Sequence, residues 1–263
     1  FLPRHYYALF ARGENAVLSG CLQNFVDGIE RNLENRNYVH TGWPAFGILP
    51  SLLQRFEGRI RIVYLHRDPY RVAASLSTHK VYERGEWSEA MSITPFDTDF
   101  GENGLWRKLW DSTSEFEKCL FWWSAINRFA LNLRESNPGI PWLTVRFEDL
   151  FEHANVSEFR RLVEFLDLRW RADLSRELFK KRDLASKKTS DSVDLSSARN
   201  FPDVRKVADE LGYPMGPAEE RRQKAVIRER YEVGSLEKFS GRSRSWVNAL
   251  RRSSGRFWKN FRK

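Results

Sequence analysis

An arginine, an aspartate and a proline stand together at a point where the sequence predicts the end of a strand. The run at 60–65 is apolar and rich in β-branched residues, which predicts a buried parallel strand. Asp68 followed by Pro69 is typical of a helix start, because aspartate accepts the free amides of the first turn and proline needs no amide partner there. Arg67 would then lie at the carboxyl end of a strand beside a helix amino terminus, where open α/β sheets bind ligands.

A serine on the following helix completes the pattern. Ser75 lies seven residues after Asp68, about two helical turns, so both residues fall on one face of the helix. A long Arg67 side chain could then meet the Ser75 hydroxyl at a single anion. An ordinary strand, loop and helix with a surface arginine explains the turn chemistry equally well, because anion sites are only one use of such helix starts.

Arg-Asp-Pro with a serine eight residues after the arginine resembles the 3′-phosphate-binding motif of sulfotransferases. These enzymes use 3′-phosphoadenosine 5′-phosphosulfate (PAPS) as the sulfuryl donor. The resemblance implies that Arg67 and Ser75 hold the 3′-phosphate of the nucleotide. Spacing and context match together, so the motif is more specific than the tripeptide alone.

Two further segments extend the resemblance over residues 36–215. Residues 146–150, Arg-Phe-Glu-Asp-Leu, resemble the Arg-(Tyr/Phe)-Glu-Asp-Leu segment of the family, and the Leu-Gly-Tyr at 211–213 recurs in bacterial sulfotransferases. Neighbouring strand residues point to opposite faces, so we expect Glu148 and Asp149 to serve in capping and structural pairing rather than in catalysis.

The resemblance implies an α/β fold, a three-layer parallel sheet with helices on both faces, of the P-loop NTPase-like sulfotransferase type. A strand at 38–41, a helix at 46–56 and the central strand would form a βαβ unit with a right-handed crossover. An apolar run at 141–150 predicts a second buried strand. Apolar periodicity predicts further helices at 4–35, 115–136, 159–166 and 201–213.

The phosphate loop that grips the 5′-phosphosulfate in this family is not found. Residues 11–16 are the nearest candidate, but Glu14 would face the phosphate and the preceding residues are predicted to be helical. We therefore expect an N-terminally incomplete fold whose loop lies upstream of residue 1. The alternative is a degenerate or inactive relative.

We expect three parts along the chain. Residues 1–215 would form the sulfotransferase-like domain, 216–240 a C-terminal helical extension and 241–263 a basic, aromatic tail. The stretch at 83–114 is polar and broken by glycine and proline, yet it carries tryptophans. Long irregular stretches are often functional lids, so we interpret it as facing the acceptor; a packed surface loop is the alternative.

The implied reaction is in-line transfer of a sulfuryl group from PAPS to an acceptor hydroxyl or amine, which needs a base but no metal. Cytosolic sulfotransferases place Lys-Thr-His before the central unit. The comparable segment here ends in Thr41 and Gly42, so the threonine fits and the usual base position holds glycine. His40 and His79 are the two candidate bases, because imidazole accepts a proton near neutral pH. A structural role is the alternative for each.

Basic residues in the polar stretch at 180–200 give further candidates. Lys187 and Arg199, together with Lys188, could form a basic lip over the nucleotide. The alternative is a solvated loop, because charge runs are mostly exposed.

Three functions of different class remain open. The first is a PAPS-dependent sulfotransferase acting on a small-molecule or carbohydrate acceptor. The second is a non-catalytic relative that binds a nucleotide or a partner. The third, another P-loop transferase or kinase, is disfavoured because neither a Walker lysine motif nor an obvious magnesium-binding carboxylate stands out.

The basic charge of the chain is concentrated at its end. The net charge of the 263 residues is +9, and the stretch 241–263 holds eight basic and no acidic residues, which leaves about +1 elsewhere. A neutral body argues against a nucleic-acid surface. Cys21 and Cys119 lie in apolar helical patterns and predict buried thiols of a reducing compartment. No membrane-spanning run or signal peptide is recognised, so we expect a cytoplasmic location.

Aromatic residues interleave with the positive charges of the tail. Trp246, Val247 and Leu250 share one face of a possible helix, as do Phe257 and Phe261 farther on. This pattern suits a segment at an anionic membrane surface, which would make the protein membrane-peripheral. The alternatives are a solvated terminus and, disfavoured by the neutral body, an arm that binds single-stranded nucleic acid.

Overall fold

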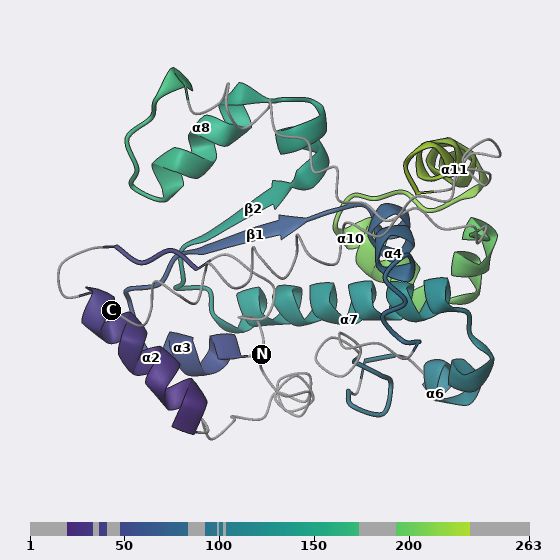
Figure 1. The fold of residues 1–263 in the computed structure, drawn as a ribbon, viewed down its shortest axis with the longest axis horizontal. Helices are drawn as coiled ribbons and strands as arrows, with labels where there is room; N and C mark the ends of the chain where they lie inside the picture. The colour runs from purple at the N-terminus through teal and green to yellow at the C-terminus, as the bar shows by residue number, and fades with distance from the viewer. Residues whose placement is uncertain are drawn as a thin grey trace, which may run out of the picture.

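Two parallel strands form the centre of the fold (Figure 1). The computed structural model describes residues 20–33, 37–40, 48–83, 93–98, 100–101, 104–173 and 193–231. Strand β1, Ile62–His66, pairs with strand β2, Trp142–Arg146, and the register places His66 opposite Arg146. The carboxyl ends of the two strands therefore coincide, as the predicted ligand-binding edge requires.

A helix covers each face of this sheet (Figure 1). Helix α8, Val156–Phe165, lies on one side, where Leu143 and Val145 of β2 join an apolar cluster with Leu150. Helix α7, Glu115–Ser136, lies on the other side, where the Tyr64 hydroxyl donates to the side chain of Asn127. The described residues form a mostly helical α/β arrangement with a two-stranded parallel sheet. The wider three-layer sheet stays a prediction.

The strand predicted at 38–41 is wrong for the residues that the structure describes. Residues 37–40 have no strand pairing, and Val39 is 57% exposed. The Tyr38 hydroxyl lies 3.3 Å from Nδ1 of His40, so these side chains contact each other. A strand forms only where a neighbouring strand offers its backbone, and among the described residues no strand pairs with 37–40.

The strand, turn and helix around Arg67 follow the prediction. Helix α4, Pro69–Ser77, starts directly after Asp68, whose Oδ1 accepts a hydrogen bond from the backbone amide of Arg71 at 3.1 Å. Proline occupies the first helical turn, where its missing amide is harmless. The cap therefore fixes where the helix begins, one residue beyond Arg67.

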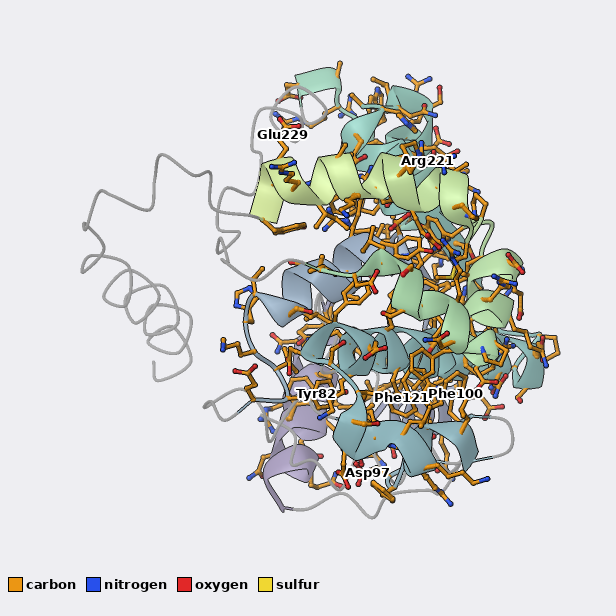
Figure 2. All side chains as sticks on the ribbon, turned by 90° about the vertical axis from the view of Figure 1, so that its right-hand side faces the viewer. Tyr82, Asp97, Phe100, Phe121, Arg221 and Glu229 are labelled. Carbon is orange, nitrogen blue, oxygen red and sulfur yellow. The ribbon has the colours of Figure 1, made fainter. Side chains whose placement is uncertain are left out.

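Helix α7 carries the main hydrophobic core. It begins with a capping box in which Ser114 and Glu117 each bond to the other's backbone amide, which fixes its start. Its buried aromatic face belongs to the core, and Phe121 is fully buried. Figure 2 shows Phe121 beside Phe100, with ring centroids 5.8 Å apart. Cys119 is a buried free thiol, and burial raises its pKa.

The remaining helices surround this centre. Helices α10, Pro202–Glu210, and α11, Pro217–Tyr231, lie beside α7 and α4, at the carboxyl end of β1 (Figure 1). The predicted helices at 46–56, 159–166 and 201–213 are confirmed within the described residues. The other elements are α2 Gly20–Leu33, α3 Leu49–Arg55, α6 Leu105–Leu109, η3 Trp110–Ser112, the π-helical turn η4 Glu148–Glu152 and η5 Leu195–Asn200.

Several predictions fall on residues outside the described part. These are the loop candidate at 11–16, residues 41–42, Lys187, Lys188, much of the stretch 84–103 and the tail at 241–263; nothing of their structure enters below. The side chain of Cys21 is also outside it. Within the described ranges, no helix combines the length and the apolar character that a bilayer crossing requires.

Candidate anion-binding site

The peptide unit between Arg67 and Asp68 is hydrogen-bonded from two sides. Its carbonyl, that of Arg67, accepts from the indole Nε1 of Trp123 on α7 at 2.9 Å. Its amide, that of Asp68, donates to Oε1 of Glu148 in the π-helical turn after β2 at 3.0 Å. The turn between β1 and α4 is therefore fixed by the helix below the sheet and by the segment that follows the second strand.

The Arg67 guanidinium has donors without partners. Its Cζ lies 4.3 Å from the ring centroid of Phe147, so the cation stacks on an aromatic face. Its Nε and Nη2 are buried and make no hydrogen bond to any described residue. Buried N–H groups of a cation are costly to leave unpaired, and a phosphate oxygen is a strong acceptor for them. This chemistry fits the phosphate that the resemblance implies.

Ser75 is half-buried on α4, and within the described part no contact joins it to Arg67. One turn earlier on the same helix face stands Arg71, which is buried and already bonded. It donates to the carboxylate of Glu152 and, through Nε, to Oε1 of Gln223 at 2.7 Å. The structure thus places both predicted phosphate ligands on one turn-and-helix unit, and their convergence on one anion stays a prediction.

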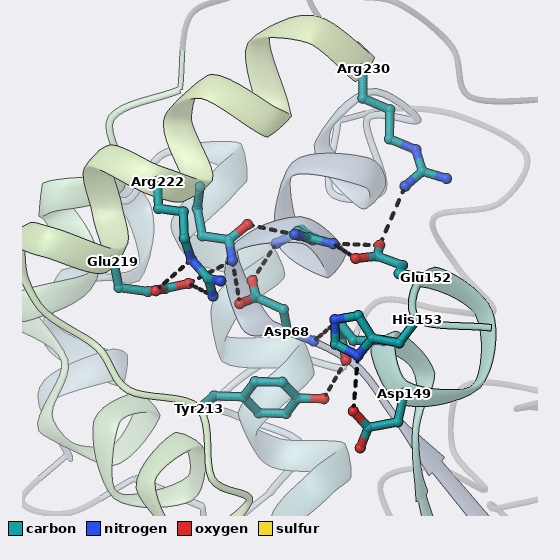
Figure 3. A network of polar contacts seen from close by, with 11 residues as sticks. Asp68, Asp149, Glu152, His153, Tyr213, Glu219, Arg222 and Arg230 are labelled. Atoms are coloured by element: carbon teal, nitrogen blue, oxygen red, sulfur yellow. Dashed lines mark hydrogen bonds and ion pairs between the residues drawn. The ribbon is translucent and has the colours of Figure 1, made fainter. Parts of the chain in front are cut away.

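A buried polar network lies beside this turn (Figure 3). Gln223 of α11 donates to Oδ2 of Asp68 at 3.1 Å and to Glu219 at 2.6 Å. Asp68 is 5% exposed, and burial raises its pKa to about 6. Sequence reasoning missed Gln223 and Glu152, because a single glutamine or glutamate on an amphipathic helix carries no signal of burial.

Glu148 has the structural role that its sequence position suggested. Besides holding the Asp68 amide, its Oε2 accepts from the Tyr213 hydroxyl at 2.9 Å. Both residues are buried. The neighbouring Asp149 contacts His153 at 3.3 Å on the surface. The three segments that resemble sulfotransferases therefore meet at one point, through Asp68, Glu148 and Tyr213.

His66 and Arg146 stand side by side at the ends of the strands. The Arg146 guanidinium lies 4.6 Å from the ring centroid of Tyr213, and His66 meets the same ring edge-on at 5.4 Å. Burial and, to a lesser degree, the charge of Arg146 lower the pKa of His66 to about 4. The imidazole is therefore neutral at physiological pH. The sequence analysis did not identify His66, although its place next to Arg67 was a usable signal.

The two predicted bases lie on the surface. His40 contacts Tyr38 and the edge of Phe25, and partial burial lowers its pKa. His79 follows the last turn of α4, about 15 Å along the helix from its start at Asp68. Neither histidine makes a described contact with Arg67, so their role as base stays a prediction.

Arg199 is part of an ion pair. Its Nε donates to Oε1 of Glu220 at 2.7 Å, and its Nη2 bonds to the other carboxylate oxygen. The pair links η5 to α11 and lowers the pKa of Glu220. This bond gives Arg199 a structural role, and its expected contact with a nucleotide stays a prediction.

Comparisons with known proteins add little. No family model matches the chain, and no curated protein matches it. Among solved structures, the chain is similar to a sulfotransferase domain from the curacin biosynthetic pathway, with a TM-score of 0.44 and 15% sequence identity. The match covers 74% of this chain and 69% of that one. A similarity of this size does not establish a shared fold or activity.

Proposed function

We propose that the chain is a sulfotransferase that takes its sulfuryl group from PAPS. The observation that carries the proposal is the Arg67 guanidinium, which stands at the carboxyl end of β1 with two buried donors that no described residue satisfies. It belongs to an Arg-Asp-Pro motif with a serine at the family spacing. The three segments that resemble sulfotransferases meet beside it, because Glu148 accepts hydrogen bonds from both the Asp68 amide and the Tyr213 hydroxyl.

In the proposed reaction an acceptor hydroxyl or amine attacks the sulfur in line. The bond from sulfur to the bridging oxygen of the donor breaks, a bond from sulfur to the acceptor forms, and adenosine 3′,5′-bisphosphate leaves. Arg67 would bind the 3′-phosphate with charge-assisted hydrogen bonds, and the Ser75 hydroxyl would donate to the same group. His40 or His79 would take the acceptor proton. The acceptor class proposed is a small molecule or carbohydrate.

A second candidate is a non-catalytic relative that binds the nucleotide or a partner. The position of the predicted bases favours it, since His79 lies at the far end of α4 from Arg67 and His40 contacts Tyr38 on the surface. A relative that binds the nucleotide shares the nucleotide site with the enzyme and differs from it only in turnover.

Calorimetric titration with adenosine 3′,5′-bisphosphate tests the shared site. Arg67→Ala and Ser75→Ala should each weaken binding by about 1.5–3 kcal/mol, the usual cost of losing a hydrogen bond to a charged group, because the phosphate acceptor is ionised in both cases. Arg59→Ala is the matched control, because Arg59 is an exposed arginine just before β1. Equal affinity in the Arg67 and Arg59 variants would contradict the assignment.

A transfer assay with PAPS and a panel of hydroxyl and amine acceptors separates the two functions. His40→Ala or His79→Ala should abolish turnover while nucleotide affinity stays unchanged. Nucleotide binding without turnover on any acceptor favours the non-catalytic relative. Full turnover in both variants places the base on another residue.

A further inference from the structure

We propose that Glu148 and Tyr213 are positioning residues that hold Arg67 in the orientation in which it binds the 3′-phosphate. The inference rests on the proposed function. Neither residue would touch the nucleotide; both would act through the peptide unit that follows the Arg67 Cα.

The first step of the argument is the geometry of that peptide unit. A peptide is planar, and its carbonyl and amide point in opposite directions. Trp123 donates to the Arg67 carbonyl at 2.9 Å, and Glu148 accepts from the Asp68 amide at 3.0 Å. Two bonds on opposite sides prevent the plane from rotating, so ψ of Arg67 is fixed and with it the direction in which the side chain leaves the backbone.

The second step is the charge of Glu148. Glu148 is buried, at 9% residue exposure, and its carboxylate accepts from two neutral donors, the Asp68 amide and the Tyr213 hydroxyl, with no cation paired to it among the described residues. A buried carboxylate without a cation is expensive compared with an apolar residue of the same size. In return, a charged acceptor makes a stronger hydrogen bond to the amide than a neutral one. The site thus keeps its turn rigid at a cost in stability.

The third step is the support of Tyr213. Tyr213 is 3% exposed, and its ring contacts both Arg146 and His66, the last residues of the two strands. The hydroxyl is therefore fixed relative to the sheet, and it holds one oxygen of Glu148 while the other holds the turn. A contact chain runs from the Leu-Gly-Tyr segment to Arg67.

The experiment compares affinities for adenosine 3′,5′-bisphosphate and for adenosine 5′-monophosphate, which lacks the 3′-phosphate. The dissociation constant for adenosine 5′-monophosphate divided by that for adenosine 3′,5′-bisphosphate reports the contribution of the 3′-phosphate alone. A general loss of stability leaves this ratio unchanged. Glu148→Gln and Tyr213→Phe should each lower this ratio about tenfold, as expected for one weakened hydrogen bond to a charged group. Calorimetry is done well below the melting temperature of each variant.

Glu152→Gln is the matched control. Glu152 lies in the same π-helical turn and bonds to Arg71, but it does not touch the peptide of Arg67. This variant should be destabilised and keep the ratio of the unsubstituted chain. Trp123→Phe removes the hydrogen bond on the other side of the same peptide, so it should lower the ratio too and replaces Glu148→Gln if that variant does not fold.

The outcomes are distinct. A lowered ratio in the Glu148, Tyr213 and Trp123 variants together with an unchanged ratio in Glu152→Gln supports the positioning role. An unchanged ratio in all of them, with binding intact, overturns the inference and leaves the proposed function standing. An unsubstituted chain that does not prefer the 3′-phosphorylated nucleotide overturns both.

Discussion

The rings of Trp106 and Phe201 stack almost parallel, with centroids 3.8 Å apart and planes at 7°. Trp106 is 1% and Phe201 2% exposed, so the pair fastens α6 to the start of α10 inside the core. This part of the stretch 83–114 is therefore helical and contributes Trp106 to the core, and its role toward an acceptor stays a prediction.

We expect Phe201→Ala to lower the free energy of unfolding by about 3–5 kcal/mol, because it removes a large buried ring and leaves a cavity beside Trp106. Denaturant unfolding measures the change. The control is Phe96→Ala, since Phe96 is 61% exposed and should change stability by less than about 0.5 kcal/mol. Similar losses of unfolding free energy in the two variants would show that the stacked ring stabilises the fold no more than an exposed phenylalanine does.

Gly101→Ala should also be destabilising. Gly101 has φ +115°, and an added Cβ would lie 2.9 Å from Cδ1 of Trp106, closer than real contacts allow. Strained backbone and overpacking each cost about 1–3 kcal/mol. Gly139→Ala, where no atom lies within 4 Å and φ is not positive, should be neutral or slightly stabilising. The melting temperatures of the two variants are compared with that of the unsubstituted chain. An unchanged melting temperature for Gly101→Ala would contradict the close packing of Gly101 against Trp106.

Acid should destabilise the protein through His66. Its pKa falls from 6.5 in the unfolded chain to about 4 in the folded one, so its contribution is complete above pH 6.5 and is lost as the pH falls toward 4. At 1.36 kcal/mol per pKa unit, the loss between pH 7 and pH 5 is about 2 kcal/mol.

His66→Phe keeps an aromatic ring in contact with Tyr64 and Tyr213, and it should remove the loss of unfolding free energy between pH 7 and pH 5. Asp68 opposes the effect, because its raised pKa of about 6 makes protonation stabilise the folded state, but it is present in both chains. Unfolding free energies at pH 7 and pH 5 are compared. The same pH dependence in both chains would show that His66 titrates normally.

Arg199→Ala should lower stability by about 1–3 kcal/mol. It leaves the carboxylate of Glu220, whose side chain is 9% exposed, without its partner. The double variant Arg199→Ala/Glu220→Ala should recover part of this loss, because both partners are then gone. Denaturant unfolding tests the pair. Loss of adenosine 3′,5′-bisphosphate affinity in both variants would instead support the basic lip predicted from the sequence.

The tail gives a prediction from sequence alone. If residues 241–263 bind membrane, the full chain should cosediment with anionic vesicles and be released by salt, at about 1 kcal/mol per basic residue near the surface. A chain that ends at Ser240 should not cosediment, and neutral vesicles serve as the control. Equal behaviour of the two chains excludes a membrane role for the tail.

Local signals made much of the fold predictable. The Asp-Pro pair predicted the start of α4 and the long apolar periodicity predicted α7, because these determinants lie within a few residues of each other. The strand predicted at 38–41 failed for the opposite reason. A strand needs a partner elsewhere in the chain, and a short apolar stretch does not specify one.

The candidate site divides in the same way. The position of Arg67 at the end of β1 followed from its neighbours in sequence. The polar network around the turn did not follow from the sequence. Arg71, for example, would ordinarily be assigned to the surface, but it is buried and bonded to Glu152 and Gln223. The separation of His79 from Asp68 could have been anticipated from the length of α4, since each helical residue advances the chain by about 1.5 Å.

The turn that carries Arg67 depends on residues that are synthesised much later. Trp123 lies 56 residues beyond Arg67, and Glu148 and Gln223 lie 80 and 155 residues beyond Asp68. The backbone hydrogen bonds that form helix α7 are local, whereas each of these contacts must first close a long loop. On the ribosome the turn can therefore reach its final geometry only after Gln223 has emerged, and any premature stop before α11 removes a partner of Asp68.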